Sequence, residues 1–370
     1  MTDWNRIRSF FPACRKFTYL NPAGGSPVSI QAASAAKNYY DEMLHEGDTL
    51  YDLWLERKEK VRTTLARFIN ASPDEVAFTL NTSHGMNLVA GMIDTSGEIL
   101  TMHDEFPSTT FPWIHKGVKM KHVMPVDNGY PLENIENAIS NHTRALVSSH
   151  VQYNTGFRQD AVALGQLCRK YKLIHVLNIT QSIGAMPIDA RKFEADFMVF
   201  TGLKWPMAGY GIGGIYINKE IQENVKFPVA GWQSVELPEE MNNRTMKLQK
   251  RAAVLEPGCP HFGNIFALGA ALELLDEIGS KNIQERIMEL NRYLVKKLQG
   301  LKAEIITPLD EKHRSGITVT RHSNAKTIVE KLASRKIIVS ARGEGIRISL
   351  HIYNNEEDID CFIKELKRIY

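Results

Sequence analysis

Apolar residues follow helix-like and strand-like spacings in turn through most of the 370-residue chain. Residues 29–70 have the helical spacing, interrupted at Gly47-Asp48, and residues 161–171 form a further helix between two strand-like runs. Helices that connect such runs are typical of α/β folds with a largely parallel sheet. The expected strands are 75–80, 98–102, 119–124, 145–150, 173–177, 197–200 and 214–217.

The pattern changes after about residue 263. Two amphipathic helices are expected at 264–278 and 283–301, and short strands then alternate with a helix before a C-terminal helix. This ending indicates a small α+β domain, with strands at 316–320, 337–340 and 346–350 and a helix at 325–334. We therefore expect a large domain at 15–265 and a small domain made of 1–14 and 266–370.

Composition and charge narrow the classes of function. Lys plus Arg number 45 and Asp plus Glu number 42, a formal charge of +3, so nucleic acid is not expected as a partner. No run of 18 apolar residues and no secretory signal are present, so no membrane partner is expected either. The cysteines lie far apart, so disulfides are not expected and a cytoplasmic location is. Neither the cysteines nor the 12 histidines have the spacing of a metal site. These cysteines are Cys14, Cys168, Cys259 and Cys361.

Polar residues follow two of the predicted strands in the stretch 175–214. Asn178 stands at the end of one strand, and Lys204 comes soon after the next, with Trp205 beside it. Because ligands of open α/β sheets lie at the carboxyl ends of strands, both residues belong to a candidate site. A lysine in an apolar setting can form a Schiff base with a carbonyl cofactor, and an exposed surface lysine is the plain alternative. The glycine-rich run 209–214 precedes a strand, so it does not match a dinucleotide-binding loop.

Two further segments have both a functional and a structural interpretation. Thr82 and Ser83 follow a strand and open a helix, where they either bind an anion or simply cap the helix. Arg347 lies in an alternating strand, where it either grips a carboxylate through two hydrogen bonds or belongs to a solvated face. Taken alone, each segment favours the structural interpretation.

Taken together, these segments resemble the class V aminotransferase family of pyridoxal-phosphate (PLP) enzymes. This fold-type I group includes cysteine desulfurases, isopenicillin-N epimerase-like proteins and kynureninases. The resemblance extends from residues 19–25 to residues 347–354. It implies an α/β fold, with a mostly parallel seven-stranded sheet in the large domain and a small α+β C-terminal domain. It also implies PLP as the cofactor, an amino acid as the substrate, and a homodimer with shared active sites.

The resemblance also implies a role for each candidate residue. Lys204 is expected to hold PLP covalently and to move protons at the substrate Cα, and Arg347 to bind the substrate carboxylate. Asn21 and Trp232 are expected near the substrate side chain. The segment 256–260 resembles one that a partner subunit lends to the site, and it supplies Gly258 and Cys259. The other expected cofactor-binding residues are Thr82, Ser83 and Thr201 at the phosphate, and Phe106, Tyr153, Asn178 and Gln181 at the ring.

Two positions depart from the family pattern, and one stretch departs from the desulfurases in particular. Asn178 replaces the usual Asp, whose charge keeps the ring nitrogen protonated, so the ring is expected to be a weaker electron sink. Either fast transamination gives way to elimination or epimerisation, or Asn178 still hydrogen-bonds the ring nitrogen and the enzyme is merely slower. Cys259 stands where Thr is common, and a thiol is a weak hydrogen-bond partner for a phosphate. The stretch 338–346 lacks the catalytic cysteine of desulfurases. We expect an aminotransferase, with a Cβ lyase or epimerase and a non-catalytic PLP-fold binding protein as alternatives.

Overall fold

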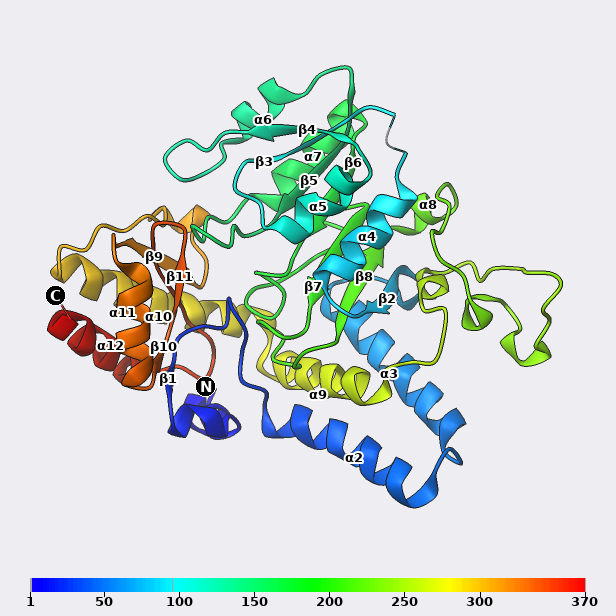
Figure 1. Ribbon diagram of the computed structural model, residues 1–370, viewed down its shortest axis with the longest axis horizontal. Helices are drawn as coiled ribbons and strands as arrows, with labels where there is room; N and C mark the ends of the chain where they lie inside the picture. The colour runs from blue at the N-terminus through cyan, green and yellow to red at the C-terminus, as the bar shows by residue number, and fades with distance from the viewer. Residues whose placement is uncertain (1, 95, 370) are drawn as a thin grey trace.

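The computed structural model describes residues 2–94 and 96–369, and its first elements link the two ends of the chain (Figure 1). Helix α1 (Trp4–Ser9) begins where the Asp3 carboxylate accepts the N–H of Arg6. Strand β1 (Thr18–Tyr19) then pairs in parallel with β10 (Ile337–Ile338). The N-terminal segment that joins the C-terminal elements thus extends beyond the predicted boundary at residue 14, and the division into domains stays a prediction.

Two long helices follow, as the spacing predicts. Helix α2 (Ile30–Glu46) begins where the Ser29 hydroxyl accepts the N–H of Ala32, and it ends at Gly47, whose φ is +61°. This left-handed conformation suits glycine, which has no Cβ to clash with the backbone. Helix α3 (Tyr51–Phe68) starts four residues later. The predicted interruption of the helical stretch is therefore confirmed.

Seven strands form the central sheet, in the order β2-β8-β7-β6-β5-β3-β4. All run in one direction except β8, which is antiparallel to both of its neighbours. Most of these strands are buried along their whole length, as is typical of a sheet covered on both faces. The predicted mostly parallel seven-stranded sheet is confirmed. The strands are β2 (Val76–Thr79), β3 (Glu98–Met102), β4 (Lys119–Val123), β5 (Thr143–Ser149), β6 (Ile174–Asn178), β7 (Phe197–Thr201) and β8 (Gly213–Ile217).

Helices cover this sheet and join its strands. Four of them connect the strands: α4 (Thr82–Met92), α5 (Pro107–His115), α6 (Leu132–Ala138) and α7 (Ala161–Tyr171). Helix α9 (Phe262–Ile278) is apolar on nearly every side and packs against α2 and α3 in one hydrophobic core. Figure 1 shows α2, α3 and α9 together beside the sheet. Helix α9 therefore spans the predicted boundary at residue 265.

The C-terminal elements form a second, smaller sheet. Strands β11 (Ser340–Arg342), β12 (Gly345–Ser349) and β9 (Ile317–Arg321) pair antiparallel in that order. The strand expected at 337–340 is split, because Ile337 and Ile338 pair with β1 whereas Ser340 pairs with β12. Helices α10 (Ser280–Gly300), α11 (Ala325–Ser334) and α12 (Glu356–Ile369) complete a core with these strands.

The segment between β8 and α9 has little regular structure. After α8 (Lys219–Gln222), residues 223–261 form short 3-10 turns and one isolated β-bridge between Val235 and Leu248, and Figure 1 shows this segment looping away from the sheet. Within the two described ranges, none of the helices is both long enough and apolar enough to cross a membrane.

Candidate active site

A cavity of about 220 Å³ lies at the carboxyl ends of three neighbouring strands of the large sheet. Strands β5, β6 and β7 each contribute their last residue to its wall: Ser149, Asn178 and Thr201. Open α/β sheets bind their ligands at this edge. The structure therefore brings most of the candidate residues to one place. Those that line the cavity are Thr82, Ser83, Phe106, Tyr153, Asn178, Gln181, Thr201 and Lys204.

Lys204 follows β7 and extends into this cavity. Burial, with smaller contributions from the positive charges of Arg347 and Arg342, lowers the pKa of Lys204 to about 7. Its Nζ lies 5.4 Å from the centroid of the Phe106 ring. At neutral pH a large share of molecules therefore carries a neutral amine, the form that attacks carbonyl carbons and accepts protons. The plain alternative of an exposed surface lysine is wrong.

Arg347 reaches the same region from β12 of the small sheet and is only 1% exposed. Its Nη1 donates to the carbonyl oxygen of Tyr153 at 3.0 Å, whereas Nε and Nη2 are buried without a hydrogen-bond partner. Burial, followed by the charge of Arg342, lowers the pKa of Arg347 to about 9. Nε and Nη2 form one edge of the guanidinium, which can bind a carboxylate through two parallel hydrogen bonds. Arg347 is therefore not part of a solvated strand face.

Hydrogen bonds fix the orientation of two amides in the cavity wall. Asn178 Oδ1 accepts the backbone N–H of Thr180 at 3.0 Å. Gln181 Oε1 accepts the indole N–H of Trp205 at 2.8 Å, and its Nε2 donates to the carbonyl of Ala23 at 3.0 Å. Because an indole only donates and a carbonyl only accepts, the nitrogen of Gln181 keeps one hydrogen for a further partner.

Helix α4 directs its N-terminus at the cavity. Asn81 caps the helix, since its Oδ1 accepts the N–H of His84 at 2.9 Å, so Thr82 is not needed for capping. The N–H groups of Thr82 and Ser83 belong to the first turn, which has no intrahelical acceptors. The Thr82 hydroxyl shares a hydrogen bond of 2.6 Å with that of Thr180. This helix end therefore offers hydroxyls, N–H groups and a positive dipole to an anion.

The aromatic side of the cavity consists of Phe106 and Tyr153. Their ring centroids are 5.1 Å apart, and the rings meet edge to face at 82°. Phe106 precedes α5 and is 40% exposed. Its exposed surface can therefore stack against a flat ligand.

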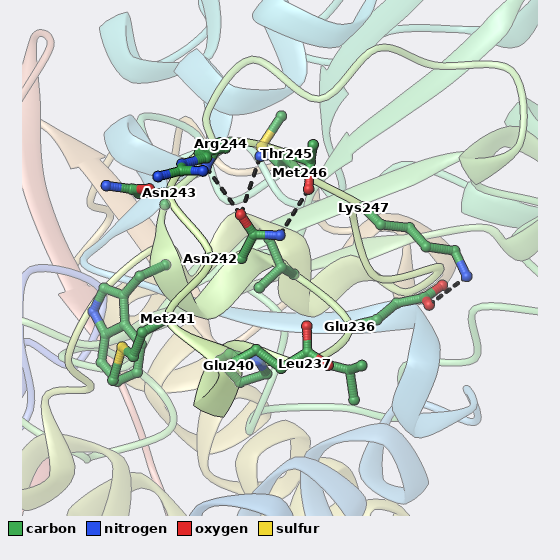
Figure 2. A pocket seen from close by; sticks show the side chains of 15 residues that line it. Glu236, Leu237, Glu240, Met241, Asn242, Asn243, Arg244, Thr245, Met246 and Lys247 are labelled. Carbon is green, nitrogen blue, oxygen red and sulfur yellow. Dashed lines mark hydrogen bonds and ion pairs between the residues drawn. The ribbon is translucent and has the colours of Figure 1, made fainter.

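Besides Arg347, which contacts the wall residue Tyr153, four candidate residues are not part of the cavity wall of a single chain. Asn21 sits directly behind Gly24 of the wall, where an added Cβ on Gly24 would come within 2.6 Å of the Asn21 amide. Trp232 is 42% exposed and lines a different pocket, in which Glu236 and Lys247 form an ion pair of 2.6 Å (Figure 2). The other two are Gly258 and the exposed Cys259.

Sequence reasoning missed a buried polar group behind the cavity. Glu105 accepts the N–H of Ser149 at 2.6 Å, the Ser149 hydroxyl at 2.5 Å and the amide of Gln152 at 2.9 Å. Thr109, also buried, lies between Glu105 and Asn178 and accepts from Asn178 Nδ2 at 2.9 Å. The only available signal was the polar stretch that follows β3, since nothing in the pattern marks Glu105 as buried.

Comparison with known proteins connects this geometry to a family. The family model described as Aminotransferase class-V matches residues 18–362. The chain belongs to the class V aminotransferase family. An uncharacterized aminotransferase of Bacillus subtilis (strain 168), YcbU, is 26% identical over 364 residues, covering 98% of this chain and 96% of that protein. A probable cysteine desulfurase of Pyrococcus abyssi (strain GE5 / Orsay) is 27% identical over 391 residues, with coverages of 98% and 96%.

Solved structures agree with this assignment of the fold. The apo structure of the cysteine desulfurase from Thermococcus onnurineus NA1 superposes with a TM-score of 0.92 at 24% identity. The match covers 100% of this chain and 98% of that one. The predicted fold class and family are therefore confirmed. The class V protein is a PLP-dependent enzyme, which leaves the non-catalytic alternative without support.

The residues of the cavity fit the predicted cofactor. PLP combines a phosphate, an aldehyde and a flat aromatic ring. The cavity offers a helix N-terminus at Thr82, an amine at Lys204 that is partly neutral at pH 7, and an exposed aromatic face at Phe106. In the described residues, no three His, Cys, Asp or Glu side chains lie where they could hold a metal ion.

Proposed function

We propose that this class V enzyme acts on an α-amino acid as an aminotransferase, with Lys204 as its catalytic residue. One observation carries the proposal: the pKa of the Lys204 amine is lowered to about 7 by burial and by the charge of Arg347, a buried guanidinium whose Nε and Nη2 have no partner. An α-amino acid has an amine and a carboxylate on one carbon. These are the groups that a carbonyl site and a free guanidinium edge recognise.

PLP, when bound, supplies an aldehyde that condenses with amines and a ring that withdraws electrons from the substrate Cα. Thr82 and Ser83, at the N-terminus of α4, bind its phosphate together with Thr201. Phe106 would stack against the ring. Among the remaining wall residues, Tyr153 and Gln181 would contact the ring oxygen, and Asn178 would contact the ring nitrogen.

Arg347 and Lys204 have different roles toward the substrate. The Nε and Nη2 edge of Arg347 binds the substrate carboxylate, so the amino acid has one orientation and its Cα–H bond is held near the amine. The neutral form of Lys204 accepts the proton from Cα and returns it to the acceptor carbon, a role that its lowered pKa supports. Asn21, behind the wall at Gly24, contributes to the choice of substrate side chain.

The enzyme is further proposed to be a homodimer with shared active sites. Trp232, Gly258 and Cys259 lie away from the cavity of their own chain, which supports their use in the site of a second copy. Glu256 holds their segment in place, since its carboxylate accepts two hydrogen bonds from Arg62 of α3. Four free cysteines support a reducing, cytoplasmic location. Sedimentation velocity at micromolar concentration tests the dimer, and a monomer would contradict it.

A screen of amino acids against the PLP-loaded enzyme tests the reaction. An aminotransferase converts the cofactor to its amine form, with loss of absorbance near the visible edge, and releases the matching keto acid. Release of pyruvate or alanine without that conversion would instead establish a lyase. Lys204→Ala is expected to abolish the conversion, and Arg347→Lys, which keeps the charge but not the fork, to weaken substrate binding. A persulfide on the β11–β12 hairpin is not expected, because residues 338–346 contain no cysteine.

A further inference from the structure

Three buried polar side chains form a chain that leads away from the cavity. Asn178 lines the cavity at the end of β6, Thr109 lies fully buried on α5, and Glu105 lies buried just before that helix. Asn178 Nδ2 donates to Thr109 Oγ1 at 2.9 Å. The Thr109 hydroxyl in turn interacts with the Glu105 carboxylate and lowers its pKa. The roles proposed above use neither Thr109 nor Glu105.

Glu105 is surrounded by hydrogen-bond donors. The backbone N–H and the hydroxyl of Ser149 donate to it, as does the amide nitrogen of Gln152. Burial raises the pKa of Glu105, and these donors together with Thr109 act in the opposite direction. A carboxylate accepts from all four donors at once, whereas a protonated acid would turn its own hydrogen toward one of them. The Thr109 hydroxyl favours the charged form of Glu105, as a donor does, so its single hydrogen is directed at that side chain.

This arrangement fixes the direction of the Asn178 amide. Because the Thr109 hydrogen points to Glu105, its oxygen presents a lone pair to Asn178, and only the amide nitrogen can bond to it. At the other end, the N–H of Thr180 can only donate, so it requires the amide oxygen. A flipped amide would place donor against donor at Thr180 and lone pair against lone pair at Thr109. The second hydrogen on Nδ2 is left for a ligand in the cavity.

We propose that Glu105 and Thr109 hold the Asn178 amide nitrogen toward the cavity, where it donates a hydrogen bond to the ring nitrogen of PLP and keeps that nitrogen unprotonated. The inference rests on the proposed binding of PLP in this cavity. A ring nitrogen that accepts a hydrogen bond along its lone pair cannot carry a proton there. Glu105 and Thr109 are positioning residues, since they act on the ring only through Asn178.

The test is the ¹⁵N resonance of the ring nitrogen in enzyme reconstituted with PLP labelled at that atom. We expect the wild-type enzyme to show the resonance of an unprotonated pyridine, and Asn178→Asp to move it upfield to the pyridinium position. Thr109→Ser, which keeps the hydroxyl, should leave the resonance in place. Thr109→Val, which removes the lone pair that selects the amide nitrogen, should broaden it or move it toward the pyridinium position.

Two results would overturn the inference: a pyridinium resonance in the wild-type enzyme, or the same resonance in Thr109→Val as in Thr109→Ser. The first comparison needs only the wild-type enzyme and Asn178→Asp, so it does not depend on whether Thr109→Val folds. A wild-type protein that takes up no PLP, seen as no absorbance near the visible edge, would refute the proposed function as well.

Discussion

Replacing Lys204 with methionine is expected to stabilise the cofactor-free protein while removing the amine that we propose to be catalytic. Methionine keeps the apolar stem and removes the ionisable group. Burial, followed by the charges of Arg347 and Arg342, lowers the pKa of Lys204 from its ordinary 10.5 to about 7. The folded protein therefore disfavours a charge that the unfolded chain carries freely at pH 7.

The size of this effect follows from the linkage between protonation and folding. One pKa unit corresponds to about 1.4 kcal/mol, so Lys204 costs the folded state at most about 4 kcal/mol at pH 7. Between pH 7 and 10.5 the unfolded chain binds a proton that the folded lysine has lost, so stability rises with pH across this window. The gain from Lys204→Met should therefore shrink from about 4 kcal/mol at pH 7 to about 1 kcal/mol or less at pH 10.

Urea unfolding of the PLP-free proteins at pH 7 and pH 10 measures the gain. Protein concentrations must be equal, since association shifts apparent stability. Lys326→Met is the matched control, because Lys326 is an exposed lysine on α11, and it should change stability by about 0.5 kcal/mol or less at either pH. A loss of stability in Lys204→Met at pH 7, or a gain that is equally large at pH 10, would refute the reasoning.

Three further predictions concern single side chains. Arg347→Leu should raise the KM for an amino acid by about 100-fold or more, since charge-assisted hydrogen bonds contribute about 3 kcal/mol, and an unchanged KM in steady-state assays would exclude its role. Arg62→Met should cost about 3–5 kcal/mol in urea unfolding because it leaves Glu256 buried without its main partner, whereas Arg67→Met, at an exposed ion pair on the same helix, should cost about 1 kcal/mol or less. Burial lowers the pKa of His351 to about 4, so the unfolded state binds more protons between about pH 4 and 6.5; stability should fall as the pH drops through this window, and His351→Gln should flatten that slope in thermal melts.

The central strands and the longer helices could be predicted from apolar spacing. The expected strand at 98–102 coincides with β3, and the expected helix at 161–171 coincides with α7. Strand β3 is buried along its whole length and helix α7 along one face. The apolar residues that pack in the core are therefore the same residues that produce the spacing in the sequence. Polar residues after β6 and β7 then mark the ligand edge of the sheet, which is how Asn178 and Lys204 could be predicted as part of a site, whereas Thr201 followed only from the family resemblance.

Short elements with distant partners could not be predicted in this way. Strand β1 has two residues, and it exists because it pairs with β10 near the other end of the chain. Helix α5 contains Pro112 in its interior, which local propensity counts against, yet it forms and carries Thr109 toward Asn178. In each case tertiary contacts override the local signal.

The chemical state of a site residue depends on neighbours that no sequence spacing reveals. Judged from the neighbouring sequence alone, Lys204 could equally be exposed. Its pKa is lowered by burial together with the charge of Arg347, which lies on the small sheet and far along the chain. Asn178 likewise has two hydrogen-bonding ends, and the contacts with Thr180 and Thr109 decide which way its amide is turned. A family motif therefore identifies the atoms that meet a cofactor. Whether those atoms donate, accept or carry charge follows from the buried groups behind them.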